Sequence, residues 1–422
     1  MGRPRPLIAA TLIVRDEAAN LPDCLASVSA VVDEIVVYDT GSLDGTPDLA
    51  RAAGARVLLG HWDGDFARAR NAALEMTRAQ WALIIDADER LVADPASVRD
   101  LLQRQLQLQP PSGRPDPRAD AFLLHESHLG TDGTELLTHH TARLIRTEVY
   151  RWQGRVHERL VSAAAAPARH LLPPGLARLE HLGYRDAATV RAKAERNLAL
   201  CQAVVDDLVA ARCTDVGVLA PSLFDLARSL LGVDRRQDAV DALEAIREIT
   251  TGGVPRAMAT ACLAQILLDQ GGFEEAALVL EADLRADGLV DPRLADWIRA
   301  QALGGLGDLA QALELLRGID AIQDPAGNPQ PMARVLRARA ILAAASGSLD
   351  EAREAALSAV VEHGAVAGSG PLLLEVFAGR SEELVRVLRR RAAHSLGALA
   401  AELGTAGAVG AEVSRRLAPA TV

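Results

Sequence analysis

Continuous apolar runs alternate with amphipathic stretches along the first 90 residues of the chain. The runs predict buried strands at Leu7–Val14, Asp33–Asp39, Ala55–Leu59 and Trp81–Ile85. Between them, the spacing of apolar positions predicts helices over Leu21–Val28, from Thr46 onward, and from Phe66 to about Arg78. Strands that alternate with helices in this way are typical of a doubly wound, mostly parallel α/β sheet.

The strand pattern changes after residue 100 and ends before residue 190. Residues 103–120 are rich in Gln, Pro and Gly, and we expect a surface loop there. Strands are expected again at Ala121–His125 and Thr141–Arg146, with a hairpin-like turn at Gly130–Thr134 between them. We therefore place a first, α/β domain at residues 1–190.

Beyond residue 190 the chain has the pattern of paired amphipathic helices. Four similar segments contain Ala239, Ala276, Ala312 and Ala352, which are 37, 36 and 40 residues apart. Tetratricopeptide repeats have a period of about 34 residues. We expect tetratricopeptide-like repeats over residues 191–365, then C-terminal helices and a tail over 366–422. Such repeats offer a surface for a peptide or a dimer interface, or serve only to cover the first domain.

Composition excludes several classes of partner. Apolar residues make up 49% and charged residues 24% of the 422 residues, as in globular proteins. The formal net charge of −11 argues against nucleic acid or an anionic membrane surface as a partner. Lys193 is the only lysine among the 45 basic residues, which we attribute to a biased genome.

Cysteine usage and hydropathy predict the compartment. The four cysteines are scattered and have no C-x-x-C spacing, so a reducing cytoplasm is the simplest inference. The first residues contain no long apolar segment, and no stretch has the length of a membrane span. We therefore expect a cytoplasmic protein that does not span a membrane.

Carboxylates gather where three of the predicted strands end, at Arg15–Glu17, Asp39–Asp44 and Asp86–Glu89. The carboxyl ends of parallel strands meet at the edge where open α/β sheets bind ligands. In extended backbone Asp86 and Asp88 point the same way, which suits a divalent cation and a diphosphate. The alternative is an acidic turn that caps the strand. No G-x-G-x-x-G follows the first strand, so a nicotinamide enzyme is not expected.

Four segments, in order, carry a resemblance to a known family: Arg15-Asp-Glu-Ala-Ala-Asn-Leu21, Asp33-Glu-Ile-Val-Val-Tyr-Asp-Thr-Gly-Ser-Leu-Asp-Gly-Thr46, Asp65-Phe-Ala-Arg-Ala-Arg-Asn71 and Asp86-Ala-Asp-Glu89. Together they resemble the inverting nucleotide-sugar glycosyltransferases of family 2, which have the GT-A fold. The resemblance covers roughly the first 185 residues. One departure is Asp16, where the family usually has Asn before the Glu.

More narrowly, the chain is similar to the branch with C-terminal tetratricopeptide-like helices. That branch includes lipopolysaccharide-core enzymes and the sublancin-type peptide S-glycosyltransferases. The resemblance implies a site for a nucleotide-sugar donor, with UDP-hexose such as UDP-glucose as the expected class.

The resemblance also implies roles for the donor-site residues. Asp39 would accept hydrogen bonds from the pyrimidine ring, and Glu17 would lie close to the same nucleoside. Arg70 would bind the diphosphate, since a guanidinium suits phosphate oxygens. Asp44 either assists donor binding or caps the next helix. Asn71 either contacts the nucleotide or packs at the helix start.

A divalent cation, Mg²⁺ or Mn²⁺, is the implied cofactor. Asp88 would be its principal ligand, and Asp86 would reach the ribose or the metal. His157 would complete the metal shell or touch the acceptor. His181 is the second candidate for a metal ligand, and its alternative is a packing turn. The cation would offset the charge that develops on the leaving diphosphate.

An inverting transfer needs a base that takes the proton of the acceptor. In this family a G-x-V-H-E segment lies near the acceptor, and here it is Gly154-Arg-Val-His-Glu158. Glu158 is therefore the expected base, and the alternative is a surface ion pair with Arg155 or Arg159. Arg143 and Arg146 could bind phosphate or pair with nearby acids.

We therefore expect an enzyme that moves a hexose from a UDP-sugar to an acceptor. The helical repeats favour a peptide or protein acceptor, while a small molecule or a cell-surface glycan intermediate stays open. A non-catalytic scaffold is the competing class. A nucleotidyltransferase would need a Gly-rich loop with Arg and Lys after the first strand, which is absent. A homodimer through the helical domain is compatible with this architecture.

Overall fold

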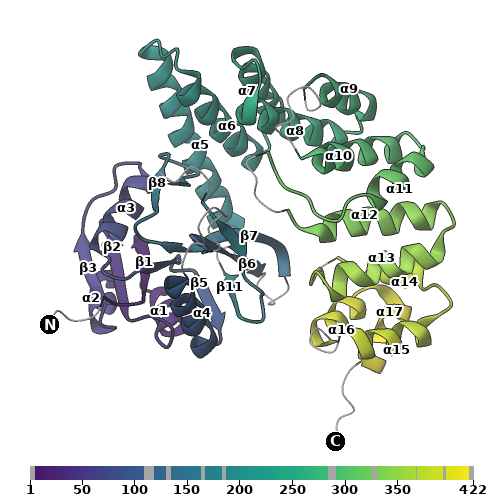
Figure 1. Ribbon diagram of the computed structural model, residues 1–422, viewed down its shortest axis with the longest axis horizontal. Coiled ribbons are helices and arrows are strands. Elements are labelled where there is room, and N and C mark those ends of the chain that lie inside the picture. Colours follow the sequence, from purple (N-terminus) through teal and green to yellow (C-terminus); the bar gives the residue numbers. More distant parts are fainter. Residues whose placement is uncertain are drawn as a thin grey trace, which may run out of the picture. The chain divides into compact units, whose positions relative to one another are not determined.

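The computed structural model describes residues 5–108, 118–129, 135–162, 167–182, 187–283, 291–325, 330–366, 368–392 and 396–417. The chain divides into two compact units, residues 1–207 and 208–422. The first is an α/β unit and the second is built from helices (Figure 1). This confirms the predicted fold class.

The border between the units lies near the end of helix α5 (Ala187–Ala210), so most of this long helix belongs to the first unit. The domain border that the sequence predicts at residue 190 lies close to the beginning of α5. The further division at residue 365 stays a prediction.

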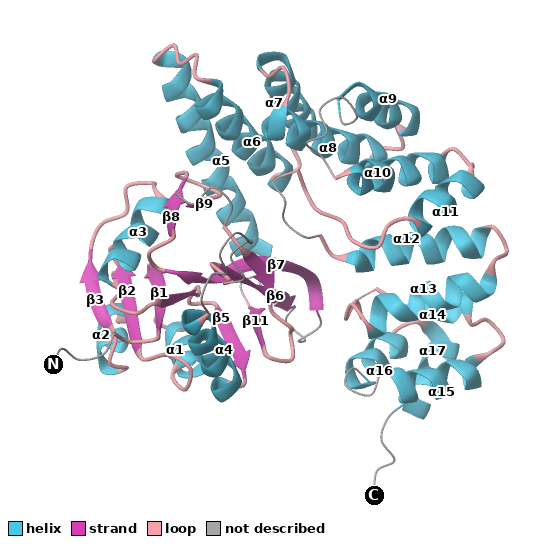
Figure 2. Cartoon of the chain, in the orientation of Figure 1, coloured by secondary structure: helices cyan, strands magenta, loops and turns pink. Residues whose placement is uncertain are grey.

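Among the described residues, nine strands form one mixed sheet (Figure 2). Its parallel part has the order β3 (Arg56–Leu59), β2 (Glu34–Asp39), β1 (Ile8–Val14) and β4 (Trp81–Ile84). The sheet continues through β7 (Glu135–Arg146), β6 (Ala121–Leu129), β11 (Ala177–His181) and β5 (Glu89–Ala93), with β10 (Arg169–Leu171) beside β6. A separate hairpin pairs β8 (Tyr150–Gln153) with β9 (Arg159–Ser162).

Helices cover both faces of the parallel part, which explains why its strands are apolar throughout. Side chains of α1 (Leu21–Val28) and α4 (Pro95–Gln107) share one core with Leu12 and Val14 of β1. On the other face, Ala69 and Ala73 of α3 (Phe66–Met76) pack with Ile13. Helix α2 (Thr46–Ala52) connects β2 to β3. Because successive side chains of a strand point to opposite faces of the sheet, one continuous apolar run contributes residues to both cores.

The structure adds antiparallel pairs to the mostly parallel sheet and corrects one expectation about a loop, while a predicted turn lies outside the described residues. The sheet is mixed, because β7 lies antiparallel to both β4 and β6, and β11 lies antiparallel to β5. Residues 103–107 belong to α4 rather than to a loop, since Leu106 packs against the same core as the buried Leu102 one turn earlier. The predicted turn at Gly130–Thr134 lies outside the described residues, but the strands on either side of it are paired as a hairpin.

The second unit consists of successive helix pairs. They are α6 (Val216–Gly232) with α7 (Arg236–Ile249), α8 (Gly253–Asp269) with α9 (Phe273–Asp283), α10 (Pro292–Gly305) with α11 (Leu309–Arg317), and α12 (Met332–Ala345) with α13 (Leu349–Val361). Shorter helices follow: α14 (Gly370–Val376), α15 (Ser381–Arg391), α16 (Leu396–Gly404) and α17 (Gly407–Leu417).

The four repeat alanines identified in the sequence occupy equivalent places in this unit. Each lies in the second helix of a pair, and each is 0% exposed: Ala239, Ala276, Ala312 and Ala352. A small side chain at this place lets the two helices of a pair approach closely. The recurring alanine is therefore the packing signature of a tetratricopeptide-like repeat.

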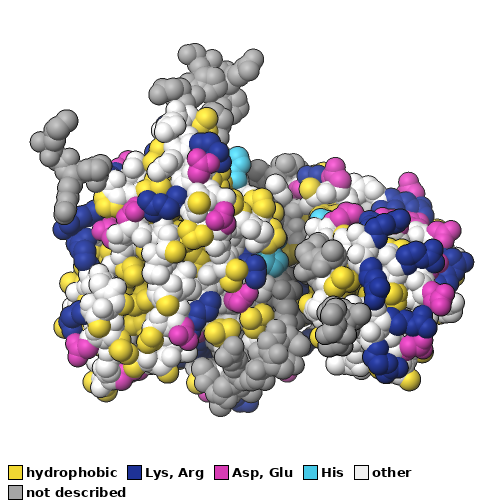
Figure 3. Space-filling view, turned by 90° about the horizontal axis from the view of Figure 1, so that it is seen from below, with side chains coloured by type: hydrophobic (Ala, Val, Ile, Leu, Met, Phe, Trp, Pro, Cys, Tyr) yellow, Lys and Arg dark blue, Asp and Glu magenta, His cyan; other side chains and the backbone are white. Residues whose placement is uncertain are grey.

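The surface of the helical unit carries both signs of charge. Figure 3 shows arginine and acidic side chains interspersed over one of its faces. The basic end of α15 is partly neutralised, because Arg391 lies 3.0 Å from Glu354 and 3.2 Å from Glu362. Among the described helices of the whole chain, none combines the length and hydrophobicity needed to cross a bilayer.

Candidate active site

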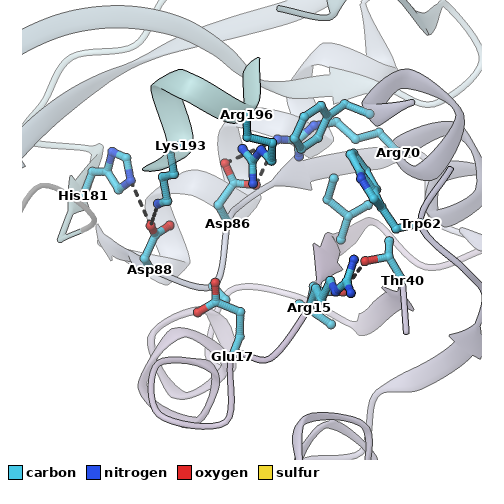
Figure 4. Close-up of a pocket in the computed structure, with 14 residues that line it drawn as sticks. Arg15, Glu17, Thr40, Trp62, Arg70, Asp86, Asp88, His181, Lys193 and Arg196 are labelled. Atoms are coloured by element: carbon cyan, nitrogen blue, oxygen red, sulfur yellow. Dashed lines mark hydrogen bonds and ion pairs between the residues drawn. The ribbon is translucent and has the colours of Figure 1, made fainter. Parts of the chain in front are cut away.

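A pocket lies at the carboxyl ends of the parallel strands of the first unit (Figure 4). The loops after β1, β2 and β4 contribute Arg15, Glu17, Thr40, Asp86 and Asp88, so the three strand ends meet as the pattern predicts. The remaining walls come from the segment before and within α3, from the end of β11 and from α5: Trp62, Phe66, Arg70, His181, Lys193 and Arg196.

The loop after β1 is tied to the loop after β2. Asp16 has a φ of 54°, a left-handed conformation that is uncommon for residues other than glycine. Its N–H donates to Ser42 Oγ at 2.8 Å, and its Oδ1 accepts from Leu43 N–H at 2.7 Å. Asn would offer the same side-chain oxygen, so the departure from the family changes a charge rather than this bond. The turn delivers Glu17 to the pocket, where burial raises the pKa of its carboxyl.

Asp39, at the end of β2, is buried and only half satisfied. Its Oδ1 accepts from the N–H groups of Gly41 and Ser42 at 2.9 and 2.8 Å, and Gly41 makes this turn possible with a φ of 105°. Its Oδ2 is buried and has no hydrogen-bond partner among the described residues. Such an oxygen costs about 1–3 kcal/mol unless a donor reaches it. Asp39 itself is not among the residues that line the pocket, but the next residue, Thr40, is.

Two of the predicted donor-site residues bind backbone in this structure. Asp44 accepts from the N–H groups of Thr46, at 2.9 Å, and Ala18, at 3.1 Å. Asn71 makes two bonds of 2.9 Å to the backbone N–H and C=O of Trp152. The contacts of Asn71 agree with the packing alternative, and Asp44 binds the first N–H of α2 from the position before the N-cap residue, Gly45. A direct donor contact by either residue stays a prediction.

Arg70 on α3 is held by two carboxylates from distant parts of the chain. Its Nε donates to Glu158 Oε1 at 2.7 Å, and its Nη2 donates to Asp86 Oδ1 at 3.0 Å. Burial alone would lower the pKa of Arg70, but Asp86 and Glu158 raise it above its usual value. Because both carboxylates hold it, the guanidinium lines the pocket in a fixed orientation.

Arg143 of β7 is buried among acidic groups. Its Nη2 donates to Glu89 at 2.6 Å and to Glu126 at 3.0 Å, and its Nη1 lies 3.7 Å from Asp86 Oδ2. The sequence predicts that Arg143 either binds phosphate or pairs with nearby acids, and the structure shows the pairing with acids. Asp86 is left between two arginines, which lower the pKa of its carboxyl against the opposing effect of burial.

Asp88 faces a different set of partners. The chain leaves the strand at Ile84, and the N–H of Glu89 closes a turn on the C=O of Asp86 at 3.0 Å. The expected extended backbone is therefore absent, and the two carboxylates point to different neighbours (Figure 4). Asp88 Oδ2 accepts from Lys193 Nζ at 3.0 Å and lies 3.3 Å from His181 Nε2. Against the effect of burial, His181 and Lys193 hold the pKa of Asp88 well below its usual range.

A group of histidines continues behind His181. Its Nδ1 lies 2.9 Å from Nδ1 of His128, whose Nε2 lies 3.1 Å from Nδ1 of His139. Glu126, His128 and His181 offer ligand atoms that all lie within 4.8 Å of one another, so these three could hold a metal ion. Burial lowers the pKa of His128 to about 4, which keeps its imidazole neutral, as a metal ligand must be.

The Gly154–Glu158 segment forms a strained turn. Gly154 has a φ of 102° and His157 a φ of 51°, and the second value is unusual for a residue with a side chain. The turn brings Glu158 back to Arg70. Neither His157 nor Glu158 is among the residues that line the pocket, whereas His181 is. The histidine beside Asp88 is therefore the second candidate, His181, and the assignment of His157 to a metal shell gains no support.

The pocket also contains residues for which the sequence motifs predicted no role. Arg196 lies with its guanidinium carbon 5.2 Å from the centre of the Phe66 ring, and the rings of Trp62 and Phe66 are 4.6 Å apart. Lys193 stands beside Asp88. Of these, Phe66 belongs to the Asp65–Asn71 motif, and Lys193 is notable in the sequence as the single lysine of the chain.

Comparisons with known proteins agree with this geometry. Residues 11–109 match the family model "Glycosyl transferase family 2". A TPR repeat-containing protein of Synechococcus elongatus is 34% identical over 203 residues, 46% of this chain and 47% of that protein. The SPbeta prophage-derived glycosyltransferase SunS of Bacillus subtilis is 25% identical over 250 residues, 57% of this chain and 53% of that protein. The matches thus span about half the length of these relatives.

Solved structures similar to this chain include a thermophilic TPR protein of Thermus thermophilus, at 17% identity and a TM-score of 0.32, covering 47% of this chain and 98% of that one. The helix pairs of the second unit and their buried alanines are the features of the repeat. The chain therefore contains a glycosyltransferase family 2 domain, followed by a tetratricopeptide-like helical region.

Proposed function

We propose that this protein is a metal-dependent inverting glycosyltransferase that moves a hexose from a UDP-sugar to an acceptor. The observation that carries the proposal is the meeting of Glu17, Arg70, Asp86 and Asp88 in one pocket, next to the half-satisfied Asp39. These residues come from four separate segments. They supply acceptors for a nucleoside, a cation for phosphate, and carboxylates for a metal.

The donor base is proposed to bind at Asp39. Uracil carries an N–H donor at N3, and the buried Oδ2 of Asp39 is an acceptor that the described residues leave without a partner. Thr40, which follows Asp39, lines the pocket, so the carboxylate lies close to the space that a nucleoside would enter. Buried polar atoms normally find a partner, which supports a ligand N–H as the missing donor.

Asp39→Asn is expected to weaken UDP binding about 10- to 100-fold. The N–H groups of Gly41 and Ser42 need an acceptor, so the asparagine oxygen would stay on them and its NH₂ would face the ligand donor. Two donors facing each other leave both unpaired, at roughly 1–3 kcal/mol. Calorimetry with UDP would measure the loss, and Asp48→Asn, an exposed acid on α2, is the matched control.

A cytidine nucleotide provides a further check on the same variant, because cytosine has an acceptor at N3. It should lose less affinity than UDP, or gain some. Equal UDP affinity in Asp39→Asn and the wild type would show that Asp39 does not contact the base.

The residues around Asp88 fit a divalent cation. The Asp88 carboxylate and Nε2 of His181 lie 3.3 Å apart at the pocket, a spacing that two ligands of one ion can share. The other nitrogen of His181 faces His128, which would fix the ring orientation as outer partners of metal ligands do. When bound, Mg²⁺ or Mn²⁺ would neutralise the charge that develops on the leaving diphosphate. Asp86 would act at the ribose or the metal.

Glu158 is proposed to take the proton of the acceptor. Its side chain is 14% exposed, and the 2.7 Å bond from Arg70 holds it at the same guanidinium that lines the pocket. Arg70 would thereby orient the base and also face the donor phosphates. This arrangement favours a catalytic position over the surface ion pair with Arg155 or Arg159.

The acceptor is proposed to be a peptide or protein that the helical unit binds, in the cytoplasm. The support is the tetratricopeptide-like repeat, an architecture suited to binding peptides. A small molecule or a cell-surface glycan intermediate is the alternative acceptor, and self-association through the helical unit is compatible with either.

Thermal unfolding with a panel of UDP-, GDP- and dTDP-sugars, with Mn²⁺ or with EDTA, tests the proposal. A UDP-sugar at 100 times its dissociation constant should stabilise the protein by about 2.7 kcal/mol, a shift of a few degrees. We expect this shift with Mn²⁺ and its loss with EDTA, together with slow release of UDP. No shift with any donor would contradict the proposal and favour the scaffold alternative.

A further inference from the structure

The pocket contains one ammonium group in a chain that otherwise uses guanidinium. Lys193 is the single lysine among 45 basic residues, and its Nζ lies 3.0 Å from Asp88 Oδ2. Figure 4 shows its side chain reaching from α5 to the Asp88 carboxylate, beside His181. A compositional bias against lysine explains its absence elsewhere. The bias does not explain why the one exception lies in the donor pocket.

An ammonium and a guanidinium differ in what they can do at this place. The ammonium is compact, carries three donors that rotate freely, and sits on a flexible four-carbon stem. The guanidinium is a planar fork that binds best in one fixed orientation. Arg70 shows the second behaviour, since two carboxylates hold it and its side chain is 11% exposed. The side chain of Lys193 is 43% exposed and has room to change partners.

Lys193 binds Oδ2 of Asp88, the residue proposed as the metal ligand. Oδ2 of Asp88 accepts from the ammonium and also lies next to His181. A divalent cation held by Asp88 would repel an ammonium at 3.0 Å from the same oxygen, so the two cations compete. The pKa of Lys193 is affected first by burial, which lowers it, but Asp88 and Glu17 raise it overall, so the group stays charged. Metal binding at Asp88 therefore requires Lys193 to move.

We propose that Lys193 is a diphosphate-binding residue that exchanges partners when the donor binds. In the free protein it neutralises Asp88. When a nucleoside diphosphate enters, the ammonium moves to a phosphate oxygen and leaves Asp88 to the divalent cation. The inference rests on the proposed function, and it adds a specific consequence: cation and diphosphate each help the other to bind.

Lys193→Gln should change two affinities in opposite directions. Without the competing ammonium, Mn²⁺ alone should bind about tenfold more tightly, while UDP in the presence of Mn²⁺ should bind about tenfold less tightly. Uridine, which has no phosphate, should bind as in the wild type. Calorimetry with uridine and UDP, and electron paramagnetic resonance of free Mn²⁺, measure these affinities directly. Arg191→Gln on the same helix, with an 81% exposed side chain, is the matched control.

A purely structural role for Lys193 predicts a different result. If its bond to Asp88 only fastens α5 to the sheet, Lys193→Gln lowers the unfolding temperature and leaves the affinities for Mn²⁺ and UDP unchanged or lowers both. Either pattern overturns the inference but keeps the proposed function. A wild-type protein that binds no nucleoside diphosphate with any metal would overturn the proposed function and the inference with it.

A second measurement needs no variant. Reductive ¹³C-methylation keeps the charge of Lys193, and because the chain has one lysine, it labels only this residue and the N-terminal amine. The lower pKa of an α-amine distinguishes the two dimethylamine signals. With Mg²⁺ present, UDP should shift the Lys193 signal and uridine should not. An unshifted signal at saturating UDP would show that the ammonium stays on Asp88, and would overturn the inference even if Lys193→Gln does not fold.

Discussion

Replacing Asp88 with alanine is expected to lower the rate of sugar transfer about 10³-fold or more while the first unit stays folded. Asp88 is the pocket carboxylate next to His181, and a cation held there is expected to supply several kcal/mol of stabilisation to the leaving diphosphate. The turn that carries Asp88 is held by backbone bonds, including Leu182 N–H to Asp88 C=O at 2.9 Å, which alanine keeps. The loss should therefore be chemical rather than structural.

Single-turnover transfer from a UDP-sugar would measure the effect of Asp88→Ala, with circular dichroism and thermal unfolding as checks of the fold. Asp48→Asn on α2, with a side chain 87% exposed, should transfer at the wild-type rate. Uridine should still bind to Asp88→Ala, because Asp39 lies on another strand. Transfer by this variant within about threefold of the wild type would rule out Asp88 as the metal ligand.

Glu158→Gln is expected to slow transfer by roughly 10²- to 10⁴-fold with little change in donor affinity. The glutamine oxygen can still accept from Arg70 Nε, so the 2.7 Å contact that positions this side chain survives. What glutamine lacks is the ability to take the proton of the acceptor. The prediction therefore separates the proposed base from a residue that only holds Arg70 in place.

Donor affinity by calorimetry and the transfer rate at saturating donor distinguish these two roles of Glu158. Glu148→Gln, which changes an exposed glutamate paired with Arg5, is the control and should leave both quantities unchanged. If Glu158→Gln transferred sugar at nearly the normal rate, the base would have to be another group. If the variant instead lost donor affinity in parallel with rate, the role of Glu158 would be to position Arg70.

The sequence determined the elements whose signals are local. The unbroken apolar runs of β1 and β4 predicted strands covered on both faces, and helices α1 and α4 on one side and α3 on the other provide that cover. The recurring alanines marked the crossings of the helix pairs, where each is fully buried. Periodicity records which side of an element faces a core, and so it was sufficient for these elements.

Periodicity could not predict which strands pair when they are far apart in the sequence. The antiparallel place of β7 between β4 and β6, and the partnership of β11 with β5, depend on contacts between segments far apart in the chain. The strands β5, β8, β9 and β10 are short, and their residues carry little periodic signal of their own. The mixed character of the sheet therefore emerged only in the tertiary structure.

In the candidate site, too, the sequence predicted the residues and only the structure showed their partners. Motifs and strand ends singled out Glu17, Asp39, Arg70, Asp86 and Asp88 from the sequence. Tertiary structure decided their partners: Arg70 with Glu158, 88 residues away, and Asp88 with Lys193, 105 residues away. A residue type predicts what a side chain can bind, but burial and neighbouring charges decide what it does bind. Those are properties of the folded chain, which is why Lys193, a compositional oddity in the sequence, became a functional candidate only in the structure.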